Sequence, residues 1–335
     1  MSTSGASPQD GANRPELVRR SWKRLVQNLL GFLIVAGFAL YLWENRDELG
    51  SALDASAAHI GALCVLVLLS WFVSGLQAVV VYRALSVRIS VREGFMLTVA
   101  GTFGNYLPMR AGTVVRALYM KRVHGVGYAR FGGITGLRTL LNVIAAGLVG
   151  TAGLIAIWAE GESGPGLLLV SVFVGFMIAP ILVMLIPAPR WEWLPQRLNR
   201  VAGDFTSAYD ELRRQPVVAI QVVALLAAQY LILSVRFLVS ANALGYEVAL
   251  ALLLLAAPLA ALTSFAALTP GGLGLREAIM GYVTLTVGYS FSEGVFIGTV
   301  DRAVLLVMLA VVGGLIFLML WRRIARVDTQ AAQAS

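Results

Sequence analysis

The feature that most constrains this chain is a break in apolar sequence by proline and glycine that occurs twice. The first reads Asn105-Tyr-Leu-Pro108-Met-Arg110-Ala-Gly112, and the second reads Leu268-Thr-Pro270-Gly271-Gly272-Leu-Gly274-Leu-Arg276-Glu277. An arginine inside a long apolar segment follows each proline, Arg138 after 30 residues and Arg302 after 32. In membrane proteins, paired interruptions at corresponding positions of two halves point to a binding site between them.

The composition places the chain in a membrane. It is 58% hydrophobic and 13% charged, whereas soluble domains are about 45–50% apolar and about 25% charged. A spanning helix needs about 20 mostly apolar residues. The segments that meet this length are 25–43, 60–82, 131–158, 166–187, 217–242 and 294–321. Shorter apolar segments adjoin the two breaks, at 95–107, 250–269 and 278–291.

The charges alternate between the two sides of the predicted bundle. Of the 26 lysines and arginines, 21 lie in 1–24, 83–94, 108–130, 188–216 and 322–335. The intervening loops hold Arg46 as their one basic residue and eight acids, Glu44, Asp47, Glu48, Asp54, Glu160, Glu162, Glu247 and Glu293. By the positive-inside rule, both termini are cytoplasmic. The net charge of +8 is thereby explained by topology and anionic lipid headgroups, so we expect no nucleic-acid partner.

The same charge map predicts two re-entrant hairpins. Both flanks of 95–107 are cytoplasmic and the segment is too short to span, so it enters and returns on one side. Both flanks of 250–291 are external, so this segment enters from the opposite face. The alternative of two full spans over 250–291 stays open. The predicted fold is an all-α polytopic integral membrane protein, with about six full spans and two re-entrant helical hairpins in an inverted repeat.

The chain is expected to form one membrane domain over 21–326, between a basic disordered tail, 1–20, and a disordered tail, 327–335. Its first half covers 21–187 and begins with an uncleaved signal anchor. An amphipathic linker, 191–214, precedes the second half, 217–321. The linker predicts an interfacial helix, and a solvated helix packed on another subunit is the alternative. A helix over 275–291 is expected to follow the second break.

Charged residues at membrane depth are the candidates for function. Arg138, Arg236, Arg276 and Arg302 lie there with Glu277 and Asp301. Each such charge costs about 2.5–3.5 kcal/mol at a helix centre, so it needs a partner or a wet cavity. Guanidinium groups match phosphate oxygens, which indicates a polar track for an anionic headgroup. Arg236, near the end of its span, is expected to snorkel to the interface.

The predicted substrate path combines these residues with both breaks. A purely structural alternative pairs Arg276 and Glu277 with Asp301 and Arg302, which would tie the second hairpin to the last span. The backbone N–H groups opening the helix after Gly274 are a further candidate for phosphate contact. The full path is Asn105, Pro108, Arg110, Gly112, Arg116, Arg138, Asn142, Pro270, Gly271, Gly272, Gly274, Arg276, Glu277, Asp301 and Arg302.

Other chemistry has little support in the sequence. The second break lacks the G-x-G-x-x-G spacing and the P-loop lysine of nucleotide sites. Cys64 is the one cysteine, which excludes an internal disulfide or a multi-thiolate metal site. His59 and His124 are expected to lie isolated on opposite faces. We therefore expect no cofactor, no metal, no catalytic residues and no enzyme activity.

The break residues resemble the flippase-like membrane domain that precedes the catalytic module of lysylphosphatidylglycerol synthases. The resemblance rests on Asn105, Pro108, Arg110, Gly112 and Arg116, then Arg138, then the run from Pro270 to Glu277, and it extends over roughly 20–325. Thr113 and Asn142 stand where the family pattern leads us to expect acids. The chain is expected to be a stand-alone domain without the aminoacyl-transferring module.

The resemblance implies a lipid transporter or flippase for a phospholipid, glycolipid or isoprenoid lipid with a polar or anionic headgroup. It would lie in the cell membrane, with membrane lipids as its partners. One alternative is a non-catalytic subunit that recruits an envelope or lipid-synthesis enzyme through the linker. The other is an intramembrane lipid enzyme that uses Glu277 or Asp301 as a base.

Overall fold

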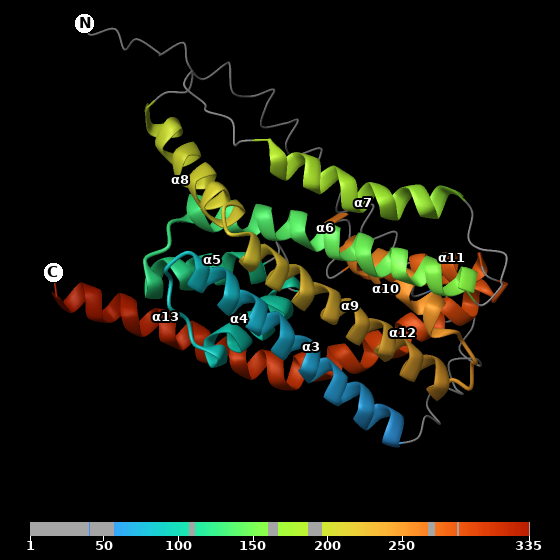
Figure 1. Ribbon diagram of the computed structural model, residues 1–335. Coiled ribbons are helices and arrows are strands. Elements are labelled where there is room, and N and C mark those ends of the chain that lie inside the picture. The colour runs from blue at the N-terminus through green and yellow to red at the C-terminus, as the bar shows by residue number, and fades with distance from the viewer. Residues whose placement is uncertain are drawn as a thin grey trace, which may run out of the picture.

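The computed structural model describes residues 40, 57–106, 111–159, 167–186, 196–266, 272–286 and 288–334, which are helical apart from short turns. No strand occurs in these ranges. Figure 1 shows the helices as one elongated bundle. In chain order they are α3 (Ala57–Ala84), α4 (Val91–Tyr106), α5 (Ala111–His124), α6 (Tyr128–Ala159), α7 (Leu167–Leu185), α8 (Gln196–Arg213), α9 (Pro216–Ala243), α10 (Leu250–Ala266), α11 (Leu275–Leu285), α12 (Phe291–Met308), the π-helical segment η4 (Leu309–Gly313) and α13 (Gly314–Ala334).

Among the described residues, five helical stretches are long and apolar enough to cross a membrane. They are α3, α6, α7, α9 and the continuous stretch Phe291–Ile324, which joins α12, η4 and α13. These match five of the six predicted spans, and the remaining one, 25–43, lies outside the described residues except for Leu40. Large apolar side chains on the outside of α7, such as Leu167 and Leu182, are exposed, as expected of a helix that faces lipid.

The helices around the two breaks are shorter. The eleven residues of α11 rise only about 16 Å, roughly half of a hydrocarbon core about 30 Å thick, so α11 does not span. The expected helix over 275–291 was wrong at its C-terminal end. The backbone turns after Thr286, Gly288 adopts a φ of +90°, and Ser290 caps the N-terminus of α12 by accepting a hydrogen bond from the Glu293 backbone N–H at 3.2 Å.

The two halves have the same order of helices. A long helix, two short helices and a long helix follow one another as α3–α4–α5–α6 and again as α9–α10–α11–α12. The leading helices α3 and α9 pack together, α6 packs on α10, and α4 packs on η4 and α13. In Figure 1, α4 and α5 lie toward the end of the bundle that holds the C-terminus, and α10 and α11 lie toward the other end.

Glycines bring the backbones of α4 and α5 into direct contact. A Cβ atom built on Gly112 would overlap the carbonyl oxygen of Gly101, and one built on Gly104 would lie 2.5 Å from the Cα of Gly112. Any side chain at these positions would therefore force the helices apart. The glycine of the first break is required by this close approach, whatever else it contacts.

The linker helix α8 packs on its own chain. The Phe205 ring lies beside Gly132 and Gly136 of α6, where the absence of side chains leaves room for it. Arg130 of α6 contacts the Glu211 carboxylate at 3.0 Å, and α8 also reaches α7, because Arg213 donates a hydrogen bond to the Met184 carbonyl at 2.8 Å. At the C-terminus, α13 continues to Ala334, so residues 327–334, expected to be disordered, are helical.

Candidate functional site

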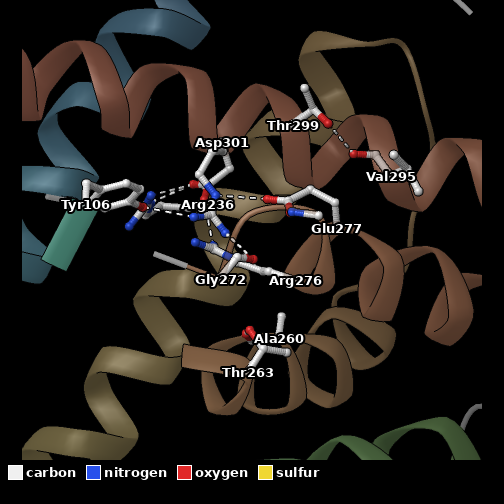
Figure 2. Close-up of polar contacts among 12 residues, drawn as sticks. Tyr106, Arg236, Ala260, Thr263, Gly272, Arg276, Glu277, Val295, Thr299 and Asp301 are labelled. Atoms are coloured by element: carbon white, nitrogen blue, oxygen red, sulfur yellow. Dashed lines mark hydrogen bonds and ion pairs between the residues drawn. The ribbon is translucent and has the colours of Figure 1, made fainter. Parts of the chain in front are cut away.

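Five charged side chains from three helices form one buried cluster, which we call the Asp301 cluster. Arg236 comes from α9, Arg276 and Glu277 from α11, and Asp301 from α12 (Figure 2). Arg302 follows Asp301 on α12. The two carboxylates have no exposed surface, and no arginine of the cluster is more than 8% exposed. Three guanidinium groups thus face two carboxylates, which leaves one excess positive charge.

Asp301 is shared by two arginines. Its Oδ1 atom lies 2.7 Å from both Nε and Nη2 of Arg236, and its Oδ2 atom accepts a hydrogen bond from Nη2 of Arg276 at 2.7 Å. Both carboxylate oxygens are occupied, which is how a fully buried charge is kept in an apolar interior. Asp301 therefore links α9, α11 and α12 at one point.

Glu277 links α12 to the turn that opens α11. Its Oε1 atom accepts a hydrogen bond from Nε of Arg302 at 2.9 Å, and its Oε2 atom accepts one from the Gly274 backbone N–H at 2.8 Å. Gly272 and Gly274 have φ angles of +73° and +81°, which side-chain-bearing residues rarely adopt. The Gly274 N–H that we expected to be available for phosphate is thus engaged by Glu277.

The first half reaches the cluster through Tyr106, the last residue of α4. Nη1 of Arg302 donates a hydrogen bond to the Tyr106 hydroxyl at 2.9 Å, and the Arg302 guanidinium lies 5.9 Å from the centre of the Tyr106 ring. The Arg276 guanidinium lies 5.0 Å from the centre of the Phe237 ring, while its Nε atom is buried without a hydrogen-bond partner.

The first half holds a separate pair of arginines, Arg116 and Arg138, in a different environment. Nε and Nη2 of Arg138 donate to Oε1 of Gln77 at 3.1 and 2.7 Å, and Gln77 is 1% exposed. The Arg116 side chain lies against the backbone of Gly101. Tyr82 of α3 lies near both guanidinium groups. Among the described residues, no carboxylate is within ion-pair distance of either arginine.

A third polar cluster joins α4 and α5, which are not among the five candidate spans, to Arg323 near the end of the last one. The Glu93 carboxylate accepts a hydrogen bond from the Tyr119 hydroxyl at 2.9 Å, pairs with Arg323 at 3.1 Å and lies 3.7 Å from Nε2 of His124. Burial alone would raise the pKa of Glu93, but hydrogen bonds from Ser90 and Tyr119 and the charge of Arg323 hold that pKa below its usual value. His124, expected to be isolated, is part of this cluster.

The structure separates the predicted path residues into these groups. Gly272, Gly274, Arg276, Glu277, Asp301 and Arg302 come together in the Asp301 cluster. Arg116 and Arg138 form the second site, Asn105 lies in the α4–α5 contact with Gly112, and Asn142 lies beside the Tyr230 hydroxyl of α9. Pro108, Arg110, Pro270 and Gly271 lie outside the described residues.

Sequence reasoning also missed several residues. The expectation that Arg236 snorkels to the interface was wrong, because Arg236 is 5% exposed and bound to Asp301. Tyr106 and Gln77 were not singled out. A signal for each existed, since Tyr106 adjoins Asn105 in the first break and Gln77 is a polar residue within an apolar span.

Comparisons with known proteins bear on the whole membrane domain. The chain matches the family model for the lysylphosphatidylglycerol synthase TM region over residues 28–313. No curated protein and no solved structure matches it significantly. The matched range includes both breaks, both arginine sites and the linker helix.

Proposed function

The chain belongs to the lysylphosphatidylglycerol synthase TM region family, and from this premise we propose that it is a non-catalytic lipid transporter. It moves a lipid with a polar or anionic headgroup between the leaflets of the cell membrane. In this proposal both termini are cytoplasmic, and α4–α5 and α10–α11 are re-entrant hairpins that enter from opposite faces. Their positions toward opposite ends of the bundle (Figure 1) support that topology.

The Asp301 cluster is the observation that carries the proposal. Charges at membrane depth are expensive and are characteristic of substrate and ion pathways. Here five of them meet. Tyr106 at the end of α4 contacts Arg302 of α12, and Arg302 in turn binds Glu277 in the first turn of α11. One ion pair would be enough to hold two helices together. This cluster has three guanidinium groups and two carboxylates, and its excess positive charge attracts an anion.

In this proposal, movement of the hairpins opens the route by which the lipid headgroup reaches the buried arginines. The π-helical segment η4 lies against α4, and a Cβ built on Gly313 would lie 3.2 Å from the Cβ of Phe103. Short π-helical segments within α-helices occur frequently at functional sites. We infer that α4 shifts against η4, the Tyr106–Arg302 contact opens, and a headgroup anion takes a place among the arginines. The acyl tails stay in the surrounding lipid throughout.

Scrambling of fluorescent lipids in proteoliposomes tests the proposal. Wild-type protein should move phospholipid faster than protein-free vesicles do, and the Arg276→Ala/Glu277→Gln variant should lose this activity while remaining folded. Glu247→Gln is a matched control, because Glu247 is an exposed acid. If the wild-type protein moves neither phospholipid nor isoprenoid-phosphate probes, the transport proposal is wrong and a role as a partner subunit takes its place.

A further inference from the structure

We propose that Arg116 and Arg138, together with Gln77 and Tyr82, form the resting site for the phosphate group of an anionic lipid. In this resting state the arginines of the Asp301 cluster are held by Asp301 and Glu277, and they become available to a headgroup only after the hairpins move. This division of roles rests on the proposed function, and it assigns the substrate class as lipids whose headgroup carries a phosphate with net negative charge.

The contrast in counter-ions between the two halves is the main argument. In the second half, Asp301 and Glu277 contact all three arginines at 2.7–2.9 Å. In the first half, Arg138 has the neutral Gln77 amide as its partner. Arg116 donates to the Gly112 carbonyl at 3.4 Å. These two partly buried guanidinium groups repel each other, and no described carboxylate pairs with either of them, so an anion between them would be attracted.

The remaining polar groups at this site are hydrogen-bond donors, which suit a ligand that carries acceptor atoms. Gln77 uses its carbonyl oxygen for Arg138, which leaves its Nε2 amide group buried and without a partner. The nearby Tyr82 hydroxyl is a further donor. An unpartnered buried donor is unusual, and here the Gln77 amide group accompanies two guanidinium groups. A phosphate offers several acceptor oxygens and accepts from guanidinium groups in a two-point geometry.

A polar row on α3 leads from this site further along the bundle. Ser70, Ser74 and Gln77 follow the i, i+4, i+7 spacing that puts residues on one helix face. The Ser74 hydroxyl donates to Oε1 of Gln229 on α9 at 2.6 Å, and the Ser70 hydroxyl is buried without a partner. The two leading helices therefore share a polar contact next to the arginine pair.

Native mass spectrometry of the full chain in detergent tests the assignment. The probes are phosphatidylglycerol and phosphatidylcholine, added to wild type and to Arg116→Gln/Arg138→Gln. A matched control, Arg88→Gln/Arg322→Gln, removes two exposed arginines and the same charge. We expect the first variant to lose at least about tenfold in phosphatidylglycerol affinity, since a hydrogen bond to a charged group contributes about 1.5–3 kcal/mol. Neither phosphatidylcholine binding nor the control should change.

A second variant keeps the test decisive where the double variant fails to fold. Gln77→Glu has nearly the same shape and places a carboxylate beside Arg138, as Asp301 does for Arg236 and Arg276. It should raise the thermal midpoint of the protein yet lower its phosphatidylglycerol affinity. A purely structural role for Arg138 predicts the higher midpoint with unchanged lipid binding, and that result would overturn the inference.

The remaining outcomes separate the inference from the proposed function. Undiminished phosphatidylglycerol binding by Arg116→Gln/Arg138→Gln, or an equal loss in the control, rejects the site but leaves transport untouched. Specific binding by a wild-type protein that does not scramble lipid rejects transport but supports the site. Displacement of the lipid by inorganic phosphate at comparable concentration would identify free phosphate as the ligand. That result would overturn the assignment of the site to a lipid headgroup.

Discussion

Arg302 in the last long helix donates a hydrogen bond to the hydroxyl of Tyr106, 196 residues earlier in the chain, at 2.9 Å. The contact is the point at which the first hairpin reaches the buried charges of the second half. Because Arg302 also binds Glu277, displacement of α4 changes the environment of an ion pair that opens α11. The two breaks recognised in the sequence are therefore joined in space.

Tyr106→Phe removes this link with little change of shape. The loss of a hydrogen bond from a charged donor is expected to cost about 1.5–3 kcal/mol. We expect a lower thermal midpoint in detergent and an altered lipid scrambling rate. Tyr282→Phe is the control, because Tyr282 is 52% exposed. Equal behaviour of the two variants would show that the Tyr106 contact has no part in stability or transport.

Asp301→Asn should be among the most damaging single changes. It leaves Arg236 and Arg276 buried without their shared counter-ion, and breaking a buried ion pair in this way costs about 3–5 kcal/mol. Thermal unfolding followed by tryptophan fluorescence measures the effect. The exposed Glu247→Gln control should unfold like wild type. A midpoint for Asp301→Asn equal to that of the control would mean that the cluster does not stabilise the fold.

Gly112→Ala tests the close contact of α4 and α5. The added methyl group would overlap the Gly101 carbonyl, and overpacking of this kind typically costs about 1–3 kcal/mol. Gly127→Ala is the control, because a Cβ there meets no atom within 4 Å. Limited proteolysis should cleave Gly112→Ala faster than Gly127→Ala. Equal cleavage would contradict the packing described for this hairpin.

The stability of the folded protein is expected to depend on pH through the carboxylate of Glu93. Its folded-state pKa is lowered from the ordinary value of 4.5, so the stabilisation is complete above that value and is lost as pH falls through the folded-state pKa. The thermal midpoint of wild type should therefore fall on acidification below about pH 4.5. Glu93→Gln should be less stable at neutral pH and show a smaller acid-induced decrease. Parallel pH curves for the two proteins would count against the Glu93 cluster.

The fold was largely predictable because its signals are local. Apolar length located five spans, and the proline and glycine breaks located the short helices between them. The error after α11 arose because Val287-Gly288-Tyr289 continues an apolar run in composition, while the backbone at Gly288 turns with a φ of +90°. Apolar composition alone does not distinguish a helix from an exposed turn between two helices.

The site was only partly predictable, because partners come from distant segments. The pairing of Arg276 with Asp301 and of Glu277 with Arg302 was foreseen as an alternative to substrate contact, and the structure confirms both contacts. Arg236 was misassigned because its distance along the helix suggested an interface, whereas packing of α9 against α12 brings it to Asp301. Gln77 stands out in the sequence as a polar residue within an apolar span, but its partner Arg138 is identified only once α3 and α6 are placed together.

A reversible cross-link between α4 and η4 tests the central claim most directly. A Cβ at Gly313 would lie 3.2 Å from the Phe103 Cβ, close to the separation of about 3.5–4.5 Å in disulfides, so Phe103→Cys/Gly313→Cys in a Cys64→Ser background should form one. We predict that the oxidised protein moves lipid slowly in proteoliposomes and that reduction restores the rate. Equal rates in the two redox states would contradict hairpin movement, and rates no faster than those of protein-free vesicles would contradict lipid transport itself.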